Sequence, residues 1–413
     1  MVIVAGLVIR AAVMFHPGHR EDLRLFEGWA EKGATHGVLN IYDPALPGIQ
    51  PDYPPLLLFV YTAAGETAGA LQGHFRDSEL FVGVIKLPAL IADVVIACML
   101  VACGTLVATR YHGIIAAALY FILPASWLDS AVWGQMDPIY AALVLWMFVA
   151  AGKGRFVMAG VAAGLAAGSK FQVVAFLPML AVIAAASGWQ ALRKGLTSFG
   201  LTLAAAFLPF IIVGQFENVL HAYTHAVGAY GVLSVDAFNM WQLFFGESAR
   251  SISDLHAAGG LSYRTWSLIV FAAGLVVAMA AVWREARRPG ISRLDLALRA
   301  AAVTSLIFFI FPTEIHDRYL FPFLALAAIW ATRGRKEMAA YLVLSVATAF
   351  NIAYPLSISV TDQFFRLVPL ADRLFALSIV VVGLGSIPML IKSRRSSPSP
   401  VDTTLTTEAA PSS

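Results

Sequence analysis

Apolar runs of roughly 17–25 residues, separated by short polar segments, recur along the whole chain. They lack the strict alternation of apolar and polar residues that is typical of a membrane β-barrel strand. Because a helix satisfies its own backbone hydrogen bonds in lipid, the pattern predicts an all-α polytopic membrane protein with about twelve transmembrane helices. The expected spans are roughly residues 1–15, 80–107, 112–127, 136–152, 155–169, 171–187, 196–214, 263–283, 296–311, 319–332, 337–356 and 373–391.

Residues 53–72 are the exception to this pattern. Their unbroken apolar run ends after Ala64, which is too short for a span. If this segment crossed the membrane, every later loop would change sides, and the basic loops would lie outside rather than in the cytoplasm. We therefore expect a helix in the outer interface, within a first external loop of residues 16–80. The strongest basic loops are residues 284–288, 333–336 and 392–395.

This topology collects the polar-rich connections on the outer face and leaves short basic loops inside. A long external loop is expected over residues 215–262. Residues 1–392 are expected to form one transmembrane domain, and the Ser-, Thr- and Pro-rich residues 393–413 a disordered cytoplasmic tail. The pattern favours a single extracytoplasmic site in a multi-pass protein of the inner or plasma membrane.

Composition agrees with a membrane protein, since 59% of residues are hydrophobic and 13% charged, against about 25% charged in soluble domains. The net charge of +3 comes from scattered loop residues, so no nucleic-acid site is expected. Cys98 and Cys103 face different sides of one helix, which argues against a disulfide or a metal pair. The sequence has no metal-ligand spacing, Gly-rich nucleotide loop or Ser/His/Asp signature, so no cofactor is expected.

Residues 19–29 form a charged segment between the first two apolar runs. A carboxylate just outside the membrane can take a proton from an acceptor hydroxyl within hydrogen-bond reach, which makes Asp22 the first candidate for a general base. A solvated acid paired with Arg20 or Arg24 is the structural alternative. The other acids that compete for the role are Glu21 and Glu27.

Two further polar motifs precede apolar helices on the outer side. Asp52 and Tyr53 precede two prolines, where an aspartate can cap the first turn; capping is the main expectation and substrate binding the second. Gln135 offers a donor and an acceptor without charge, which suits sugar hydroxyls. For Asp137, followed by a proline, helix capping and ligand contact both stay open.

Cations on the outer side are candidates for binding an anion. Lys170, two residues before Gln172, breaks the positive-inside trend, which favours a partner such as a lipid phosphate, with snorkelling as the alternative. His316 and Arg318, next to Tyr319, have the groups to hold a phosphate by charge-assisted hydrogen bonds. A salt bridge within the loop is the alternative there.

Other polar residues have weaker signals. Lys86 and Asp93 lie two turns apart on one helix, and charges within lipid usually face a partner, so a structural link between them or to a neighbouring helix is expected. Asn239 and Trp241, in the long loop, offer an amide and a ring on which a sugar can stack.

The order of these motifs resembles the GT-C superfamily of membrane glycosyltransferases. Asp22 and Trp29 keep the seven-residue spacing of the dolichyl-phosphate-glucose glucosyltransferases, whose Asp-Tyr-Pro-Pro-Leu stretch recurs at residues 52–56. The segments 91–93 and 170–172 are similar to further elements of those enzymes, the second with one residue inserted. The segments that resemble bacterial mannosyltransferases related to the second mannosyltransferase of GPI-anchor synthesis are 133–135, 237–241 and 316–319.

The resemblance implies that a hexose, mannose or glucose, moves from a polyprenyl-phosphate donor to an extracytoplasmic glycan or glycolipid acceptor. It implies a single inverting displacement with Asp22 as the base. The donor phosphate would lie near Lys170 and Arg318 with His316 assisting, and no metal is required because the lipid phosphate is a good leaving group. The residues expected to orient sugars are Gln135, Asp137, Asn239 and Trp241.

Two other functions remain open from the sequence. A transporter or flippase of lipid-linked sugars would carry charged residues along a path through the bilayer and would have pseudo-symmetric halves. A noncatalytic subunit with the same fold is the other alternative. An enzyme that uses a soluble nucleotide sugar would need a sizeable hydrophilic domain, and the sequence contains none.

Overall fold

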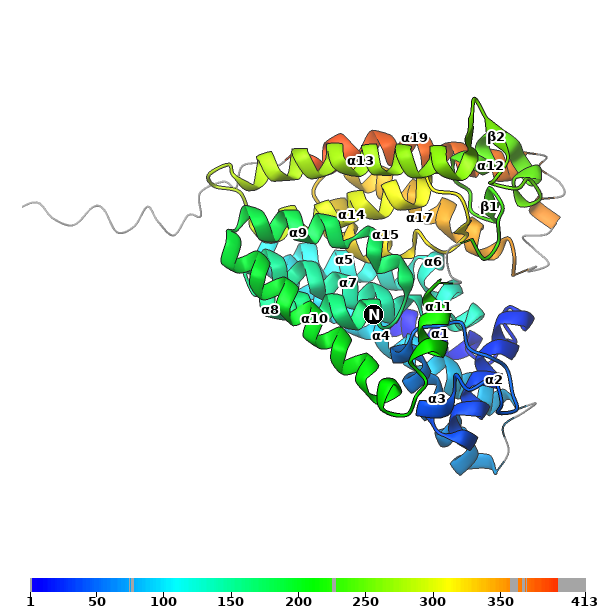
Figure 1. Cartoon of the computed structure of the whole chain (residues 1–413). Helices are drawn as coiled ribbons and strands as arrows, with labels where there is room; N and C mark the ends of the chain where they lie inside the picture. The colour runs from blue at the N-terminus through cyan, green and yellow to red at the C-terminus, as the bar shows by residue number, and fades with distance from the viewer. Residues whose placement is uncertain are drawn as a thin grey trace, which may run out of the picture.

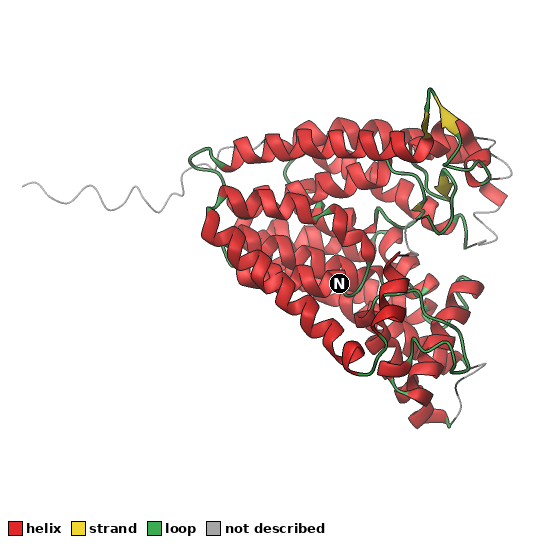
Figure 2. Cartoon of the chain, viewed as in Figure 1, coloured by secondary structure: helices red, strands yellow, loops and turns green. Residues whose placement is uncertain are grey.

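The computed structural model describes residues 2–73, 75, 78–224, 228–356, 363–365, 368 and 370–392. Helices make up nearly all of the described secondary structure, and the strands form two short pairs at one end of the molecule (Figures 1 and 2). The expectation of an all-α fold is therefore confirmed apart from these two-residue strands. The tail predicted at 393–413 lies outside the described residues.

In the first half of the chain, all the described secondary-structure elements are helices. Its elements are α1 (Val2–Val13), α2 (Arg20–His36), η1 (Val38–Asn40), α3 (Pro55–Gln72), α4 (Glu79–Val107), α5 (Arg110–Ile122), α6 (Pro124–Trp127), η2 (Leu128–Trp133), α7 (Asp137–Gly152), α8 (Phe156–Ala167), η3 (Phe171–Ala175), α9 (Leu177–Ala186) and α10 (Trp189–Ile212). Of the short elements, η2 is one turn of π-helix and the other two are 3₁₀-helices.

The second half adds the strands. Its elements are α11 (Phe216–Thr224), β1 (Ser234–Val235), α12 (Met240–Phe245), η4 (Gly246–Arg250), β2 (Ala257–Ala258), β3 (Leu261–Ser262), α13 (Tyr263–Ala286), α14 (Arg293–Ile310), β4 (Ile315–His316), α15 (Phe321–Leu326), α16 (Ala328–Ala331), α17 (Arg335–Ala353) and α19 (Ala371–Ile391). Strand β1 pairs in parallel with β4, so the long loop is joined to the segment that carries His316.

Four of the described helices, α4, α10, α13 and α19, are long and apolar enough to cross a membrane. A fifth candidate is α5 together with α6 and η2, which are bent by 54° at Pro124. Helices α1, α7, α8 and the η3–α9 segment are apolar but only 10–17 residues long. At about 1.5 Å per residue these fall short of a hydrocarbon core of about 30 Å, so the predicted count of about twelve spans is not confirmed.

Helix α3 is not among the candidate spans, and it packs along α2 beside the rest of the molecule (Figure 1). Two glycines permit this close contact. A Cβ atom on Gly65 would lie 2.2 Å from the carbonyl oxygen of Ala30, and one on Gly33 would lie 2.1 Å from Thr62 Oγ1. The placement of this helical pair outside the membrane stays a prediction.

A buried ion pair joins the first helix to the bundle. Arg10 Nε lies 2.8 Å from Asp93 Oδ2, and both side chains are almost completely buried. The hydroxyls of Tyr120 and Ser130 each donate to the Asp93 carboxylate over 2.6 Å. Burial of a charge is costly unless it is paired and hydrogen-bonded, and Asp93 meets both conditions. The expected link of Asp93 is therefore to Arg10 on a neighbouring helix, not to Lys86.

Replacing Tyr120 by phenylalanine is expected to lower the free energy of unfolding by about 1.5–3 kcal/mol, because it removes a hydrogen bond to a buried carboxylate. Thermal stability of the purified protein in detergent measures the effect. Tyr111, on the same helix, is the matched control because its side chain is exposed; Tyr111→Phe should change stability by less than about 0.5 kcal/mol. Equal losses in the two variants would contradict this description of the ion pair.

Candidate active site

Asp22 lies in the first turn of α2, where the helix dipole favours a negative charge. His19 precedes it as the N-cap residue, and His19 Nδ1 lies 3.4 Å from the backbone nitrogen of Asp22. The Oδ2 atom of Asp22 accepts hydrogen bonds from Trp133 Nε1 at 2.9 Å and Gln135 Nε2 at 2.6 Å. Both donors act on one oxygen, and the other carboxylate oxygen lies 3.5 Å from His19 Nδ1.

The surroundings of Asp22 keep it ionised. Burial alone would raise its pKa, but the hydrogen bond with His19, the charge of Arg318 and the Trp133 donor hold the pKa of this carboxyl well below its usual range. The side chain is still 22% exposed, so an incoming molecule can reach it. Asp22 is therefore ionised at neutral pH, which is the state that a general base requires.

Lys86 supports the two segments that meet at Asp22. Its ammonium group donates to the carbonyl oxygens of His16 at 2.6 Å, Ala131 at 3.1 Å and Val132 at 2.7 Å. His16 lies just before α2, and the other two lie in the π-helical turn that ends at Trp133. Lys86 thus links α4 to both segments, which places the Trp133 donor against the start of α2.

Arg318 lies between two acids. Its Nη2 atom is 3.9 Å from Asp22 Oδ2, and its Nε atom is 3.7 Å from Asp137 Oδ2. Asp137 starts α7, as the sequence predicts, and also pairs with Lys170 at 2.9 Å. The guanidinium carbon of Arg318 lies 5.1 Å from the Trp133 ring centroid, a cation–π distance. Asp137 therefore begins the helix and forms ion pairs, but its side chain does not cap the helix, whose N-cap residue is Met136.

Several buried polar atoms at this site have no hydrogen-bond partner among the described residues. They are Arg318 Nε, Asp137 Oδ2, Gln172 Oε1 and Asp317 Oδ2. Buried polar groups in folded proteins are normally paired. Donors and acceptors left in this state next to a cavity are suited to a polar ligand.

A cavity of about 320 Å³ is lined by two of these residues, Gln172 and Arg318. Tyr53 contributes to its wall, donates its hydroxyl proton to Gln135 Oε1 at 3.3 Å, and has its ring 5.5 Å from the Lys170 ammonium. Polar side chains and aromatic rings thus share this wall. The sequence-predicted residues that line it are Asp52, Tyr53, Lys170, Gln172, His316, Arg318 and Tyr319. The expectation that Asp52 caps a helix is wrong, because Pro54 is the N-cap residue of α3 and no side chain caps that helix.

Two titratable groups of this wall are shifted toward their neutral forms. Burial raises the pKa of Asp52, with the Asp22 charge adding to the effect. Burial first, and the Arg318 charge second, lower the pKa of His316 well below its ordinary value. A neutral His316 still has one N–H to donate to an anion.

A second cavity of about 460 Å³ adjoins the first and is mainly apolar. The two share part of their wall, including His316 and Tyr319. The apolar cavity extends between α13 and the η3–α9 segment. Its apolar lining includes Val174, Pro178, Leu268, Phe271, Leu275 and Phe308.

Asn239 and Trp241 line neither of these cavities. Asn239 Oδ1 caps α12 by accepting from the backbone nitrogens of Trp241 and Gln242. The Trp241 indole donates to the carbonyl oxygen of Phe311 at 2.9 Å and packs on the Phe245 ring. Both residues thus have structural partners, and we assign them no substrate contact below.

Sequence reasoning missed three residues of this site. His19 and Trp133 contact Asp22, and Tyr230 lies between the two cavities. The signal for His19 was its position three residues before Asp22, which is typical of an N-cap. Trp133 lies in the 133–135 segment, but nothing in the sequence indicates that its indole reaches Asp22. Tyr230 stands between Gly228 and Gly231, both with positive φ, which is a turn signal without chemistry of its own.

Comparison with known proteins gives the class. The sequence model of glycosyltransferase family 87 matches residues 53–312, so the chain belongs to this family of glycosyltransferases. The identification of a GT-C membrane glycosyltransferase from the motifs is thereby confirmed, whereas the specific resemblance to mannosyltransferases is not. No protein with curated function matches the sequence.

Two solved structures align with most of the chain. ArnT from Cupriavidus metallidurans bound to undecaprenyl phosphate is 14% identical, with a TM-score of 0.47, over 94% of this chain and 76% of its own. The archaeal oligosaccharyltransferase AglB from Archaeoglobus fulgidus, in complex with an inhibitory peptide and a dolichol-phosphate, is 15% identical. Its TM-score is 0.40, and the alignment covers 94% of this chain and 55% of AglB.

Proposed function

We propose that this glycosyltransferase moves a hexose, mannose or glucose, from a polyprenyl-phosphate donor to a hydroxyl of an extracytoplasmic glycan or glycolipid. The family membership favours this enzyme over the transport alternative. Asp22 acts as the general base, and the reaction inverts the anomeric carbon. The proposed reaction includes no metal, because the lipid phosphate is a good leaving group.

The donor phosphate binds in the polar cavity, beside Lys170 and Arg318. Both cations line this cavity, and the Arg318 Nε has no hydrogen-bond partner among the described residues. Charge-assisted hydrogen bonds from a guanidinium suit a phosphate well. The neutral His316 supplies a further N–H donor on the same wall.

The lipid part of the donor extends into the apolar cavity. A soluble nucleotide sugar has no group that would gain from an apolar space of about 460 Å³ next to its phosphate site. A polyprenyl chain does gain from it, because burial of its hydrocarbon is favourable. The adjoining cavities therefore support a phosphate that is attached to a lipid.

The reaction is a single displacement. The acceptor hydroxyl oxygen attacks the anomeric carbon while its proton passes to Oδ1 of Asp22, the oxygen that does not accept from Trp133 and Gln135. The bond from that carbon to the phosphate oxygen breaks, and its electron pair leaves with the lipid phosphate. Lys170 and Arg318 stabilise the negative charge that develops there.

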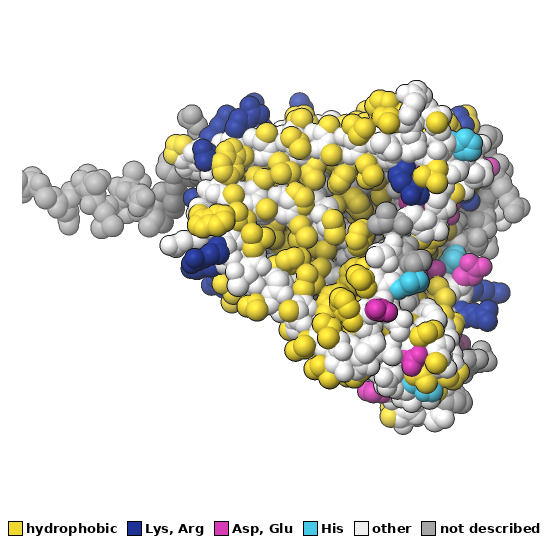
Figure 3. Space-filling model, viewed as in Figure 1, with side chains coloured by type: hydrophobic (Ala, Val, Ile, Leu, Met, Phe, Trp, Pro, Cys, Tyr) yellow, Lys and Arg dark blue, Asp and Glu magenta, His cyan; other side chains and the backbone are white. Residues whose placement is uncertain are grey.

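The charge distribution supports an extracytoplasmic site. Basic side chains gather at the end of the molecule where α13 finishes, with Arg284 in its last turn (Figure 3). The start of α13 lies at the opposite end, beside the β1–β4 pair (Figure 1). The positive-inside rule assigns the basic end to the cytoplasm, so the candidate site faces outward.

The observation that carries the proposal is an ionised Asp22 next to Arg318, which lines, together with Lys170, a polar cavity that shares part of its wall with an apolar one. Membranes that contain the protein should transfer radiolabelled hexose from a polyprenyl-phosphate hexose and not from the corresponding nucleotide sugar. Membranes without the protein are the control. Transfer from the nucleotide sugar in purified protein free of polyprenyl phosphate would contradict the proposed donor class.

Asp317 is expected to make donor binding weaker in alkaline solution. Burial raises the pKa of this carboxyl to about 8, although the neighbouring Arg318 opposes the shift. Asp317 is therefore neutral below about pH 8 and charged above it, when it competes with the phosphate for Arg318 Nη1 at 3.4 Å. The KM for the donor should rise as the pH passes about 8, and Asp317→Asn should remove that rise. An unchanged alkaline rise in the variant would show that another group causes it.

A further inference from the structure

Tyr230 lies at the junction between the polar and the apolar cavity. It contributes to the walls of both, and its side chain is 54% exposed. Its ring meets the His316 ring edge-on, with centroids 4.6 Å apart and planes at 82°. A donor with its phosphate in one cavity and its lipid in the other must pass this ring at the bond that joins them.

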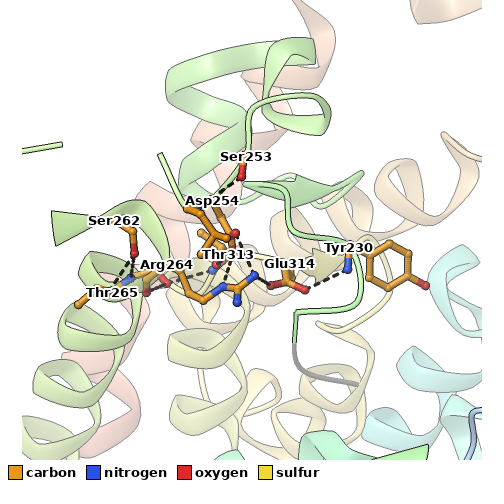
Figure 4. Close-up of polar contacts among 10 residues, drawn as sticks. Tyr230, Ser253, Asp254, Ser262, Arg264, Thr265, Thr313 and Glu314 are labelled. Atoms are coloured by element: carbon orange, nitrogen blue, oxygen red, sulfur yellow. Dashed lines mark hydrogen bonds and ion pairs between the residues drawn. The ribbon is translucent and has the colours of Figure 1, made fainter. Parts of the chain in front are cut away.

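An ionic network holds the segment that carries Tyr230 (Figure 4). The backbone nitrogen of Tyr230 donates to Glu314 Oε2 at 3.2 Å. The other oxygen of Glu314 accepts from Arg264 Nη2 at 2.7 Å, and Arg264 binds Asp254 through two nitrogens at 2.7 and 3.0 Å. A Cβ atom on Gly228 would lie 3.2 Å from Arg264 Nη1, so this turn rests directly on the guanidinium.

The same network fixes the loop before His316. Thr313 donates its hydroxyl proton to Asp254 Oδ2 at 3.0 Å, and its backbone nitrogen lies 3.3 Å from Ser267 Oγ. Glu314 has a φ of +60°, a left-handed conformation that a residue with a side chain keeps only when its surroundings enforce it. The first turn of α13 therefore supports both faces of the junction, the Tyr230 ring and His316.

We propose that Tyr230 contacts the first prenyl unit of the donor next to its phosphate, and that Asp254, Arg264 and Glu314 are positioning residues for this contact. The inference rests on the proposed function and adds a determinant of donor recognition to it. An aromatic ring covers a hydrocarbon segment well and needs no charge to do so. Tyr230 lies on a loop and not on a helix, but the three charged residues hold the backbone of that loop in one position.

The test uses the full-length protein and binding of a long-chain polyprenyl phosphate without sugar, measured beside transfer kinetics. Tyr230→Ala should weaken binding and raise the donor KM about 5- to 30-fold, which is the loss expected when one buried apolar contact is removed. The kcat should change little. Tyr230→Phe should bind as the wild type does. Glu314→Gln should show a smaller change in the same direction, because it loses the charge that pairs with Arg264.

The combination Tyr230→Ala with Glu314→Gln separates positioning from general stability. If Glu314 acts through Tyr230, the double variant should bind no worse than Tyr230→Ala alone; additive losses would overturn the positioning role. Arg288→Gln, at the far end of α13, is the matched control because it breaks the Glu285 pair away from the site. If the wild type binds polyprenyl phosphate and Tyr230→Ala binds it equally well, the inference is overturned. If the wild type neither binds polyprenyl phosphate nor transfers sugar from it, the proposed function is overturned.

Discussion

Replacing Asp22 by asparagine is expected to lower the rate of sugar transfer by about 100- to 10,000-fold, the usual contribution of a positioned general base. Asparagine has the same shape and its oxygen can still accept from Trp133 and Gln135, so the site should stay assembled. It cannot take the proton from the acceptor hydroxyl. Donor binding, measured with polyprenyl phosphate, should change little, and the loss should appear in kcat.

Glu21 is the matched control for this experiment. It lies next to Asp22 in the same turn of α2, its side chain is exposed, and the sequence alone left it as a competing candidate. Glu21→Gln should transfer at close to the wild-type rate. Normal transfer by Asp22→Asn, or a larger loss from Glu21→Gln, would remove Asp22 as the base.

Replacing Arg318 by glutamine is expected to lower transfer by about 100- to 1,000-fold, because it removes a fixed charge that faces the leaving phosphate. The loss should appear in both KM and kcat, since the guanidinium meets the phosphate before and during bond cleavage. Arg318→Lys keeps the positive charge but loses the planar guanidinium. Its transfer rate should lie between those of the wild type and Arg318→Gln. The measurement is transfer kinetics over a range of donor concentrations.

Loss of Arg318 also leaves Asp22 and Asp137 with one cation fewer, so folding must be checked. Thermal stability in detergent and the elution profile serve this purpose. The exposed Arg24 in α2 is the matched control, because Arg24→Gln removes the same charge at the same end of the molecule. Equal effects of the two substitutions on transfer would mean that Arg318 acts only through the overall charge.

Much of the candidate site could be predicted from the sequence, because its residues belong to motifs whose order along the chain indicates a membrane topology. Asp22, Gln135 and Arg318 come from three distant segments, and a topology that puts all three at one membrane face suffices to group them. The structure places Gln135 Nε2 at 2.6 Å and Arg318 Nη2 at 3.9 Å from the same Asp22 oxygen. The helical class followed from the apolar runs in the same way.

The span count and the supporting contacts could not be predicted for physical reasons. Apolar runs do not reveal where a helix bends, and Pro124 divides one predicted span into α5 and the segment that carries Trp133. Side-chain partners between distant loops leave no periodic signal. Tyr230 and Glu314 meet through a backbone hydrogen bond over 84 positions, and neither forms a recognisable motif. Asn239 has an amide that could bind a ligand, but in the structure it caps a short helix.

The most direct test of the central claim is a cryo-EM structure of Asp22→Asn with an intact polyprenyl-phosphate hexose bound. This variant should hold the donor without consuming it. The account predicts density for the phosphate in contact with Arg318 and Lys170, the prenyl chain between α13 and the η3–α9 segment, and the anomeric carbon facing residue 22. A phosphate bound elsewhere, or an anomeric carbon that residue 22 cannot reach through an acceptor hydroxyl, would contradict it.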